Sequence, residues 1–226
     1  MFRDGKWSRD TQTACQTDET QARKFMETLG SVAMIALVLI SGCGLRNTTE
    51  QVVFAPQVAV TPINIGAGAR VYLAVIDERS ETTLGRIKIY DIGYHTTEGS
   101  GDLSLVLHDS LRRGLQSLGF EVLTYPEASP VGIRIHLQSL SYNFRNENAR
   151  GRDIVPFELA AAAEAEILKG QTRVFQRMYN VSVNQIPSLF TRRWREEKIN
   201  DALSSLIGKM LADLKLLAAL KSGALP

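Results

Sequence analysis

The sequence predicts an α+β fold in which two amphipathic helices pack on one face of an antiparallel sheet of about four to six strands. Three patterns predict it: a leucine repeat of helical period at 103–118, alternating strand patterns at 133–144 and 157–183, and a second helical stripe at 195–220. Such periods distinguish helices from half-buried strands. Of the 226 residues, 44% are apolar and 22% are charged, as expected for a chain that forms a hydrophobic core.

The first strand is expected at 71–76, where a β-rich run follows glycines and precedes a polar turn with Asp77 and Arg79. A second candidate strand spans 86–92, with Ile87, Ile89 and Asp91 on one face.

The best-marked helix follows. Leucines recur every three to four residues between the start signal Asp102 and the stop signal Gly119; they are Leu103, Leu107, Leu111, Leu115 and Leu118. A short strand at 120–124 and a loop framed by Pro126 and Pro130 come next.

Residues 133–144 alternate between apolar and polar side chains and predict a half-buried strand. The stretch 157–168 is ambiguous, because four consecutive alanines favour a helix while its apolar residues share one face at period two. That face comprises Phe157, Leu159, Ala161, Ala163, Ala165 and Ile167. We interpret it as a strand, since Lys169 and Gly170 form a tight-turn signal before another strand pattern at 172–183. The small alanines would let a helix lie close to this hairpin.

The last element is predicted as one helix at 195–220. Its apolar stripe consists of Ile199, Leu203, Leu206, Ile207, Met210, Leu211, Leu214 and Leu217. Such a stripe usually packs on the sheet of its own domain, and the alternative is a surface for a partner or a membrane.

Cys43 follows a signal for export. Residues 31–40 have the length of the apolar core of a signal peptide and are too short to span a bilayer. The sequence Leu-Ile-Ser-Gly-Cys at 39–43 resembles the lipobox, in which small residues precede a lipidated cysteine. We therefore expect cleavage between Gly42 and Cys43, and acyl chains on the Cys43 thiol. Cleavage would remove Cys15 and leave no intramolecular disulfide.

The chain is accordingly divided into a signal peptide at 1–42, a lipidated tether at 43–69 and a single periplasmic α+β domain at 70–222. Residues 1–22 are polar and partly acidic, unlike the start of a signal peptide, so we infer that translation starts downstream of Met1.

Gly44 is not the aspartate that retains lipoproteins in the inner membrane, which favours the outer membrane. The pair Gly66 and Gly68 precedes a strand, whereas a dinucleotide-binding motif follows one.

The order of these parts resembles the YajG family of bacterial lipoproteins over about residues 43–214. The matching segments are 77–79, 118–120, 133–142, 179–181 beyond the turn at Gly170, and the Ile-Asn-Asp-Ala-Leu run at 199–203. The resemblance implies an envelope location and an α+β architecture. It implies no catalytic residue.

No sequence motif for catalysis, a metal or a cofactor is found. His95, His108 and His136 have no second ligand at binding spacing. Glu164 and Glu166 share a strand face and could form a catalytic carboxylate pair for glycosidic cleavage. Such a pattern more often belongs to the polar, solvent-facing side of a strand. Asp77 and Arg79 are expected to stabilise a turn.

The formal net charge of +2 does not indicate the clustered positive charge that nucleic-acid binding requires. The densest basic run comprises Arg192, Arg193 and Arg195. Its usual meaning is a solvated face, and the alternative is a contact with an anionic headgroup or glycan.

The leading hypothesis is a noncatalytic, lipid-anchored lipoprotein at the periplasmic face of the outer membrane, which binds another envelope component, a protein or a glycan. The alternative is a module that handles lipid or a small apolar ligand in a cavity lined by Leu203, Ile207 and Met210. A third hypothesis is a cell-wall enzyme, which requires Glu164, Glu166, Asp77 or Asp153 to converge in one cleft.

Overall fold

The computed structural model describes residues 47–89, 93–126, 131–144, 156–186 and 191–224, which belong to one compact unit. The expected signal peptide, Cys15, Gly42, Cys43 and Asp153 lie outside the described residues. The elements follow in the order β1 (Thr48–Val53), β2 (Arg70–Asp77), β3 (Thr83–Ile89), β4 (Gly93–Ser100), α2 (Leu103–Ser117), β5 (Glu121–Leu123), β6 (Val131–Phe144), β7 (Phe157–Lys169), β8 (Thr172–Gln185), α3 (Arg192–Leu211) and α4 (Leu214–Ala224). None of the described helices is both long and apolar enough to cross a membrane.

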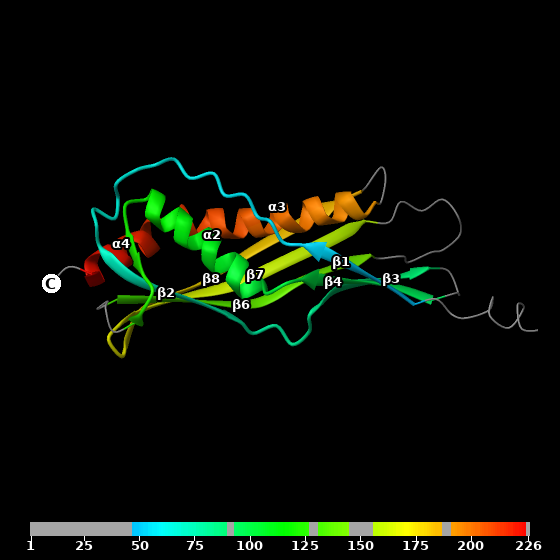
Figure 1. Ribbon diagram of the computed structural model, residues 1–226, viewed down its shortest axis with the longest axis horizontal. Helices are drawn as coiled ribbons and strands as arrows, with labels where there is room; N and C mark the ends of the chain where they lie inside the picture. Colours follow the sequence, from blue (N-terminus) through cyan, green and yellow to red (C-terminus); the bar gives the residue numbers. More distant parts are fainter. Residues whose placement is uncertain (1–46, 90–92, 127–130, 145–155, 187–190, 225–226) are drawn as a thin grey trace, which may run out of the picture. The chain divides into compact units, whose positions relative to one another are not determined.

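The strands form two sheets (Figure 1). The larger sheet has the order β5-β2-β6-β7-β8, and the smaller has the order β1-β4-β3. In the larger sheet β2 is parallel to β5 and β6, whereas β6, β7 and β8 are successively antiparallel. In the smaller sheet β1 is parallel to β4, and β3 and β4 form a hairpin that lies against β6.

The expected single antiparallel sheet with two helices is therefore wrong in detail, although the α+β class is confirmed. The described residues form eight strands in two mixed sheets with three helices. The chain passes from β2 to β6 through other elements, including α2, and a long helical crossover allows parallel pairing. Because β1 pairs with β4, the folded part begins before residue 70, the boundary expected from the sequence.

The alanine-rich segment is a strand, as predicted, and its predicted face is buried. Ala161, Ala163 and Ala165 are at most 1% exposed, and α3 packs against β7. The hairpin turn is also confirmed, with Gly170 at φ +60. The leucine helix α2 begins after Asp102, whose carboxylate accepts from the backbone N–H groups of Ser104 and Leu105. It ends before Gly119, whose φ of +84 suits glycine.

The predicted C-terminal helix is in fact two helices, α3 and α4. The helical conformation is interrupted at Asp213, between them. Tyr179 and Arg177 of β8 donate hydrogen bonds to one carboxylate oxygen of Asp213. The other carboxylate oxygen accepts from the backbone N–H of Lys215, 2.9 Å away, at the start of α4. The break rotates the stripe, so that Leu214 is 71% exposed rather than buried.

Asp213 gives the domain a pH-dependent link between the sheet and the helices. Burial raises the pKa of Asp213, but hydrogen bonds from Tyr179 and Arg177 more than offset this and hold the pKa below its ordinary value of 3.8. A depressed carboxyl pKa stabilises the fold above the unfolded value and ceases to do so as the pH falls through the folded value.

The substitution Asp213→Asn should therefore lower the free energy of unfolding by about 1–3 kcal/mol at pH 7. The effect should shrink as the pH falls through the folded-state pKa of Asp213, which lies below 3.8, because the aspartate then becomes protonated. Urea unfolding at pH 7 and at successively lower pH values measures the difference. The matched control is Asp201→Asn, because the Asp201 side chain is 58% exposed and pairs only with Lys198 in the described contacts. An equal loss of stability at all of these pH values would contradict this role of Asp213.

Candidate functional site

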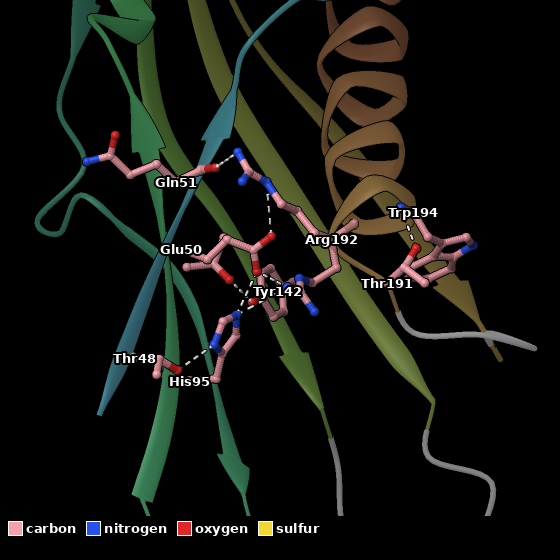
Figure 2. Close-up of polar contacts among 10 residues, drawn as sticks. Thr48, Glu50, Gln51, His95, Tyr142, Thr191, Arg192 and Trp194 are labelled. Carbon is pink, nitrogen blue, oxygen red and sulfur yellow. Dashed lines mark hydrogen bonds and ion pairs between the residues drawn. The ribbon is translucent and has the colours of Figure 1, made fainter. Parts of the chain in front are cut away.

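A buried carboxylate, that of Glu50, lies where β1, β4 and α3 meet (Figure 2). The Glu50 side chain is 8% exposed, and its Oε2 lies 2.6 Å from Nε2 of His95. Arg195, whose side chain is 6% exposed, forms an ion pair with the same oxygen. Nε of Arg192 lies 3.3 Å from the other oxygen, Oε1. We call Glu50, His95, Arg192 and Arg195 the Glu50 cluster.

Local structure explains why these side chains meet. Residues alternate along β1, and the inward positions carry Glu50 and Val52, both buried. β4 runs parallel to β1, with Thr48 opposite His95, and Oγ1 of Thr48 lies 2.8 Å from Nδ1 of His95. Arg192 and Arg195 are three residues apart and so share one face of α3. The cluster therefore requires all three elements in their native positions.

Tyr142 lies beside the cluster, because its hydroxyl binds Thr97, the residue opposite Glu50 on β4 (Figure 2). The Tyr142 hydroxyl of β6 donates to Oγ1 of Thr97 at 2.5 Å, and burial raises the pKa of this tyrosine. The ring of Phe157 lies 5.3 Å from that of Tyr142 and 4.9 Å from that of Trp194, between ring centroids. Glu50 and Arg195 are themselves buried, so these two charges interact in a medium of reduced dielectric constant, whereas Arg192 is exposed to solvent.

The polar face of α3 also binds the backbone that follows Glu50. Nη2 of Arg192 donates to the carbonyl of Gln51 at 2.9 Å. The Asn200 amide donates to the carbonyl of Val53 at 3.0 Å and accepts from the N–H of Ala55 at 2.7 Å. The Ser204 hydroxyl accepts from the N–H of Gln57 at 2.9 Å. We call residues 50–57, held in this way by α3, the leading segment.

Helix and strand geometry account for this match. Four residues advance a helix by about 6 Å, and two residues advance a strand by about 6.6 Å. Polar side chains at 192, 200 and 204 can therefore reach alternate residues of an extended chain. In the described residues, α3 takes the place of a neighbouring strand along the second edge of β1.

A shallow groove of about 950 Å³ lies between the leading segment and α3. Most of its lining residues are polar, and they carry both signs of charge: Val53, Ala55, Gln57, Arg192, Arg193, Glu196, Glu197, Asn200, Asp201, Ser204 and Ser205. Small-molecule sites are usually concave and mostly apolar. The groove thus belongs to the contact between α3 and the leading segment and does not resemble a pocket for an apolar ligand.

The basic run is not simply a solvated face. Arg195 is buried against Glu50, and Arg192 contacts both Glu50 and Gln51. Arg193 is exposed and lines the groove. The prediction of a solvated run is therefore wrong for Arg195, whose role is to neutralise a buried carboxylate.

Asp77 and Arg79 form the predicted turn. Oδ1 and Oδ2 of Asp77 accept from the Arg79 guanidinium at 2.7–3.2 Å, and Oδ1 also accepts from the Arg79 backbone N–H at 3.2 Å. Burial raises the pKa of Asp77, but the hydrogen bonds and charge of Arg79 lower it below its usual value.

The other candidate residues lie on strands of the larger sheet. Glu166 accepts from Arg173 at 3.0 Å, and Glu164 accepts from Gln176. His136 lies between two carboxylates, with Nδ1 2.7 Å from Oε1 of Glu78 and Nε2 3.7 Å from Oε2 of Glu166. Asp77 is bound by Arg79 instead, so Asp77 does not share these contacts. Within the described residues, no group of three metal-ligating side chains occurs.

The proposed apolar cavity is filled. Leu203, Ile207 and Met210 are at most 2% exposed and belong to the hydrophobic core between α3 and the sheet. A small open groove of about 270 Å³ lies elsewhere, between 59–65 and the junction of α3 and α4. The packed core does not favour the apolar-ligand hypothesis.

Sequence reasoning missed Glu50 because it lies within the expected tether. A signal was present, since Glu50, Val52 and Phe54 alternate at the period of a strand. Asn200 belongs to the 199–203 run that resembles the family, but no local pattern indicates that its amide binds the leading segment.

Comparisons with known proteins identify a family and a fold. A family model described as "Uncharacterized lipoprotein" matches residues 56–221. No curated protein matches the chain. A solved protein from Xanthomonas campestris is 11% identical, with a TM-score of 0.54 over 77% of this chain and 98% of that one. A structure described as a neuraminyllactose-binding hemagglutinin homolog from Helicobacter pylori is also 11% identical, with a TM-score of 0.50 over 75% of this chain and 98% of that one. At these identities the two matches show a shared fold.

Removal of the buried charge should destabilise the domain. We expect Glu50→Gln to lower the free energy of unfolding by about 3–5 kcal/mol, because it leaves Arg195 buried without its carboxylate. Glu197→Gln is the exposed control. The double variant Glu50→Leu/Arg195→Met should lose less than the sum of its single variants, since both members of the pair are removed together. Additive losses in urea unfolding would contradict the coupling.

Asn200→Ala should open the leading segment locally. The N–H of Ala55 loses its acceptor, so its hydrogen exchange should accelerate by roughly tenfold, corresponding to a lost hydrogen bond of about 1.4 kcal/mol. Exchange in β7 should be unchanged. The adjacent Asp201→Ala is the matched control, since Asp201 contacts Lys198 instead. Unchanged exchange at Ala55 would show that the Asn200 amide does not hold the segment.

Proposed function

Because the chain belongs to the uncharacterized lipoprotein family whose model matches residues 56–221, we propose that a lipid on Cys43 anchors it at the periplasmic face of the outer membrane and that its domain binds another macromolecule of the envelope without catalysis. The lipobox at 39–43 supports the anchor, and Gly44 supports the outer membrane. The surface that supports macromolecular binding is the uncovered face of the larger sheet.

The observation that carries this proposal is the one-sided covering of the larger sheet. Figure 1 shows α2, α3 and α4 on the same side of that sheet. On the other side, exposed or half-buried side chains alternate with buried ones along the long strands β6, β7 and β8. In the part of the chain that the structure describes, no helix covers this face. We call it the open face.

The open face carries the charged side chains of Arg134, Glu164 and Glu166 along the middle of β6 and β7, and hydroxyl, amide and small side chains toward one end. Near the ends of β6, β7 and β8 it has a shallow depression of about 370 Å³. The depression is lined by Ser141, Asn143, Glu158, Leu159, Ala160, Ser182 and Asn184. These side chains donate and accept hydrogen bonds over a broad surface, which suits a macromolecular partner better than an enclosed small molecule.

The edge of the larger sheet is less suited to a partner strand than its face. β8 forms this edge over 14 residues. Lys209 of α3 donates to the carbonyl of Asn180 at 2.7 Å, and Arg177 pairs with Asp213. Lysine and covering helices are common means of protecting sheet edges. The proposed contact is therefore made by side chains of the open face.

The macromolecule that binds the open face is either a protein or a glycan. The Helicobacter pylori structure is described as a neuraminyllactose-binding hemagglutinin homolog. That name is a reason to include a sialylated glycan among the probes, and the shared fold alone does not assign such a ligand to this chain.

Photo-crosslinking in intact envelopes tests this function. A benzoylphenylalanine placed at Ser182, on the open face, should capture one recurrent envelope component, and the same residue at Leu105 should not. Leu105 is 62% exposed on α2 and therefore serves as the control for the helical side. Mass spectrometry of the product identifies a protein, and glycan staining identifies a glycan. Equal capture from both positions, or none from Ser182, would refute the open face as the binding surface.

A further inference from the structure

The chain between the expected lipid and the folded domain is short. Four residues, 44–47, separate Cys43 from the first residue of β1, Thr48. A fully extended chain spans at most about 3.6 Å per residue, so the Cα atoms of Cys43 and Asn47 lie within about 14 Å of each other. This limit applies while the Glu50 cluster and α3 hold the leading segment. The start of β1 must then stay near the surface of the bilayer.

Tyr94 is the large exposed side chain beside this point. The backbone N–H of Tyr94 donates to Oδ1 of Asn47 at 3.2 Å, and the next residue, His95, lies opposite Thr48. The Tyr94 side chain is 50% exposed, although its neighbour His95 points into the Glu50 cluster. The alternation of β4 thus directs one side chain to the domain and the next to its surface.

The chemistry of this surface fits lipid headgroups. Tyrosine has an apolar ring and a polar hydroxyl, and it is enriched where membranes meet water. Arg86 of β3 is exposed and lies opposite Thr96, which has the same orientation along β4 as Tyr94. Directly opposed residues of antiparallel strands point to one face, so Arg86 and Tyr94 share it. A guanidinium there would attract anionic headgroups.

We propose that the face of the β3–β4 hairpin that carries Tyr94 and Arg86 rests on the headgroups of the membrane that holds the lipid of Cys43. This inference depends on the lipid anchor of the proposed function and adds an orientation to it. The short tether keeps the face within reach of the bilayer, and the tyrosine ring and the arginine charge supply the contact. The partner is the lipid surface itself, not a second protein.

A site-specific fluorescent label tests the contact. The mature lipoprotein retains one native cysteine, Cys43, whose thiol carries the lipid, so a cysteine introduced elsewhere can be labelled alone. Tyr94→Cys and the control Tyr125→Cys are labelled with an environment-sensitive dye in the full-length lipidated protein. Tyr125 is 69% exposed and follows β5, which pairs with the start of β2. The proteins are inserted in vesicles of phosphatidylethanolamine and phosphatidylglycerol that contain a headgroup nitroxide lipid.

The dye at position 94 should emit at shorter wavelength and lose intensity to the nitroxide, whereas the dye at 125 should do neither. A label at Arg86→Cys provides a second reading from the same face. Arg86→Gln should weaken the dependence of the position-94 signal on phosphatidylglycerol. If positions 94 and 125 respond alike, or if position 94 responds only after another envelope protein is added, the proposed contact is overturned.

Mass spectrometry of the N-terminal peptide separates the two proposals. A lipidated Cys43 together with no quenching at position 94 rejects the orientation and leaves the anchor intact. An unmodified Cys43 and no vesicle association reject the anchor itself, and with it the orientation. Lipidation with selective quenching at positions 94 and 86 supports both.

Discussion

The carboxylate of Glu50 is the contact on which the start of the domain depends. A charge buried in protein is stable only when ionic partners and hydrogen bonds replace water. Here those partners come from two other elements, since His95 belongs to β4, and Arg192 and Arg195 belong to α3. Loss of any one element leaves a buried charge. The Glu50 cluster therefore makes the docking of β1 cooperative with the packing of α3 on the larger sheet.

Small side chains on β7 allow α3 to serve both sheets. Ala161, Ala163 and Ala165 bring one side of α3 close to the larger sheet, where Leu203 and Ile207 fill the core. The other side of the helix presents Arg192, Asn200 and Ser204 to the leading segment. One helix thus combines apolar packing with specific binding of an extended backbone. Larger residues on β7 would shift α3 and disturb both contacts at once.

The strongly periodic elements were predictable from sequence, and the irregular ones were not. The leucines of α2 and the alternation of β6 and β7 identify those elements because each has one buried face. β4 escaped prediction because it reads Gly-Tyr-His-Thr-Thr-Glu-Gly-Ser, and its inward side carries His95 and Thr97 in polar contacts. The break at Asp213 depends on Tyr179 and Arg177 of a distant strand. A local pattern cannot report such tertiary partners, and for the same reason the sequence revealed the candidate site only in part.

Release of the leading segment would break the ion pairs of Glu50 and the hydrogen bonds from Arg192, Asn200 and Ser204 together. Hydrogen bonds of this kind contribute about 0.5–1.5 kcal/mol each, so several of them together keep the undocked state rare. Release would add the leading segment to the free chain beyond Cys43 and let the domain move away from the bilayer. If Cys43 carries the proposed lipid, the four residues at 44–47 set the distance between the docked domain and the bilayer. A partner of the open face would then have to reach it while the domain remains close to its own membrane.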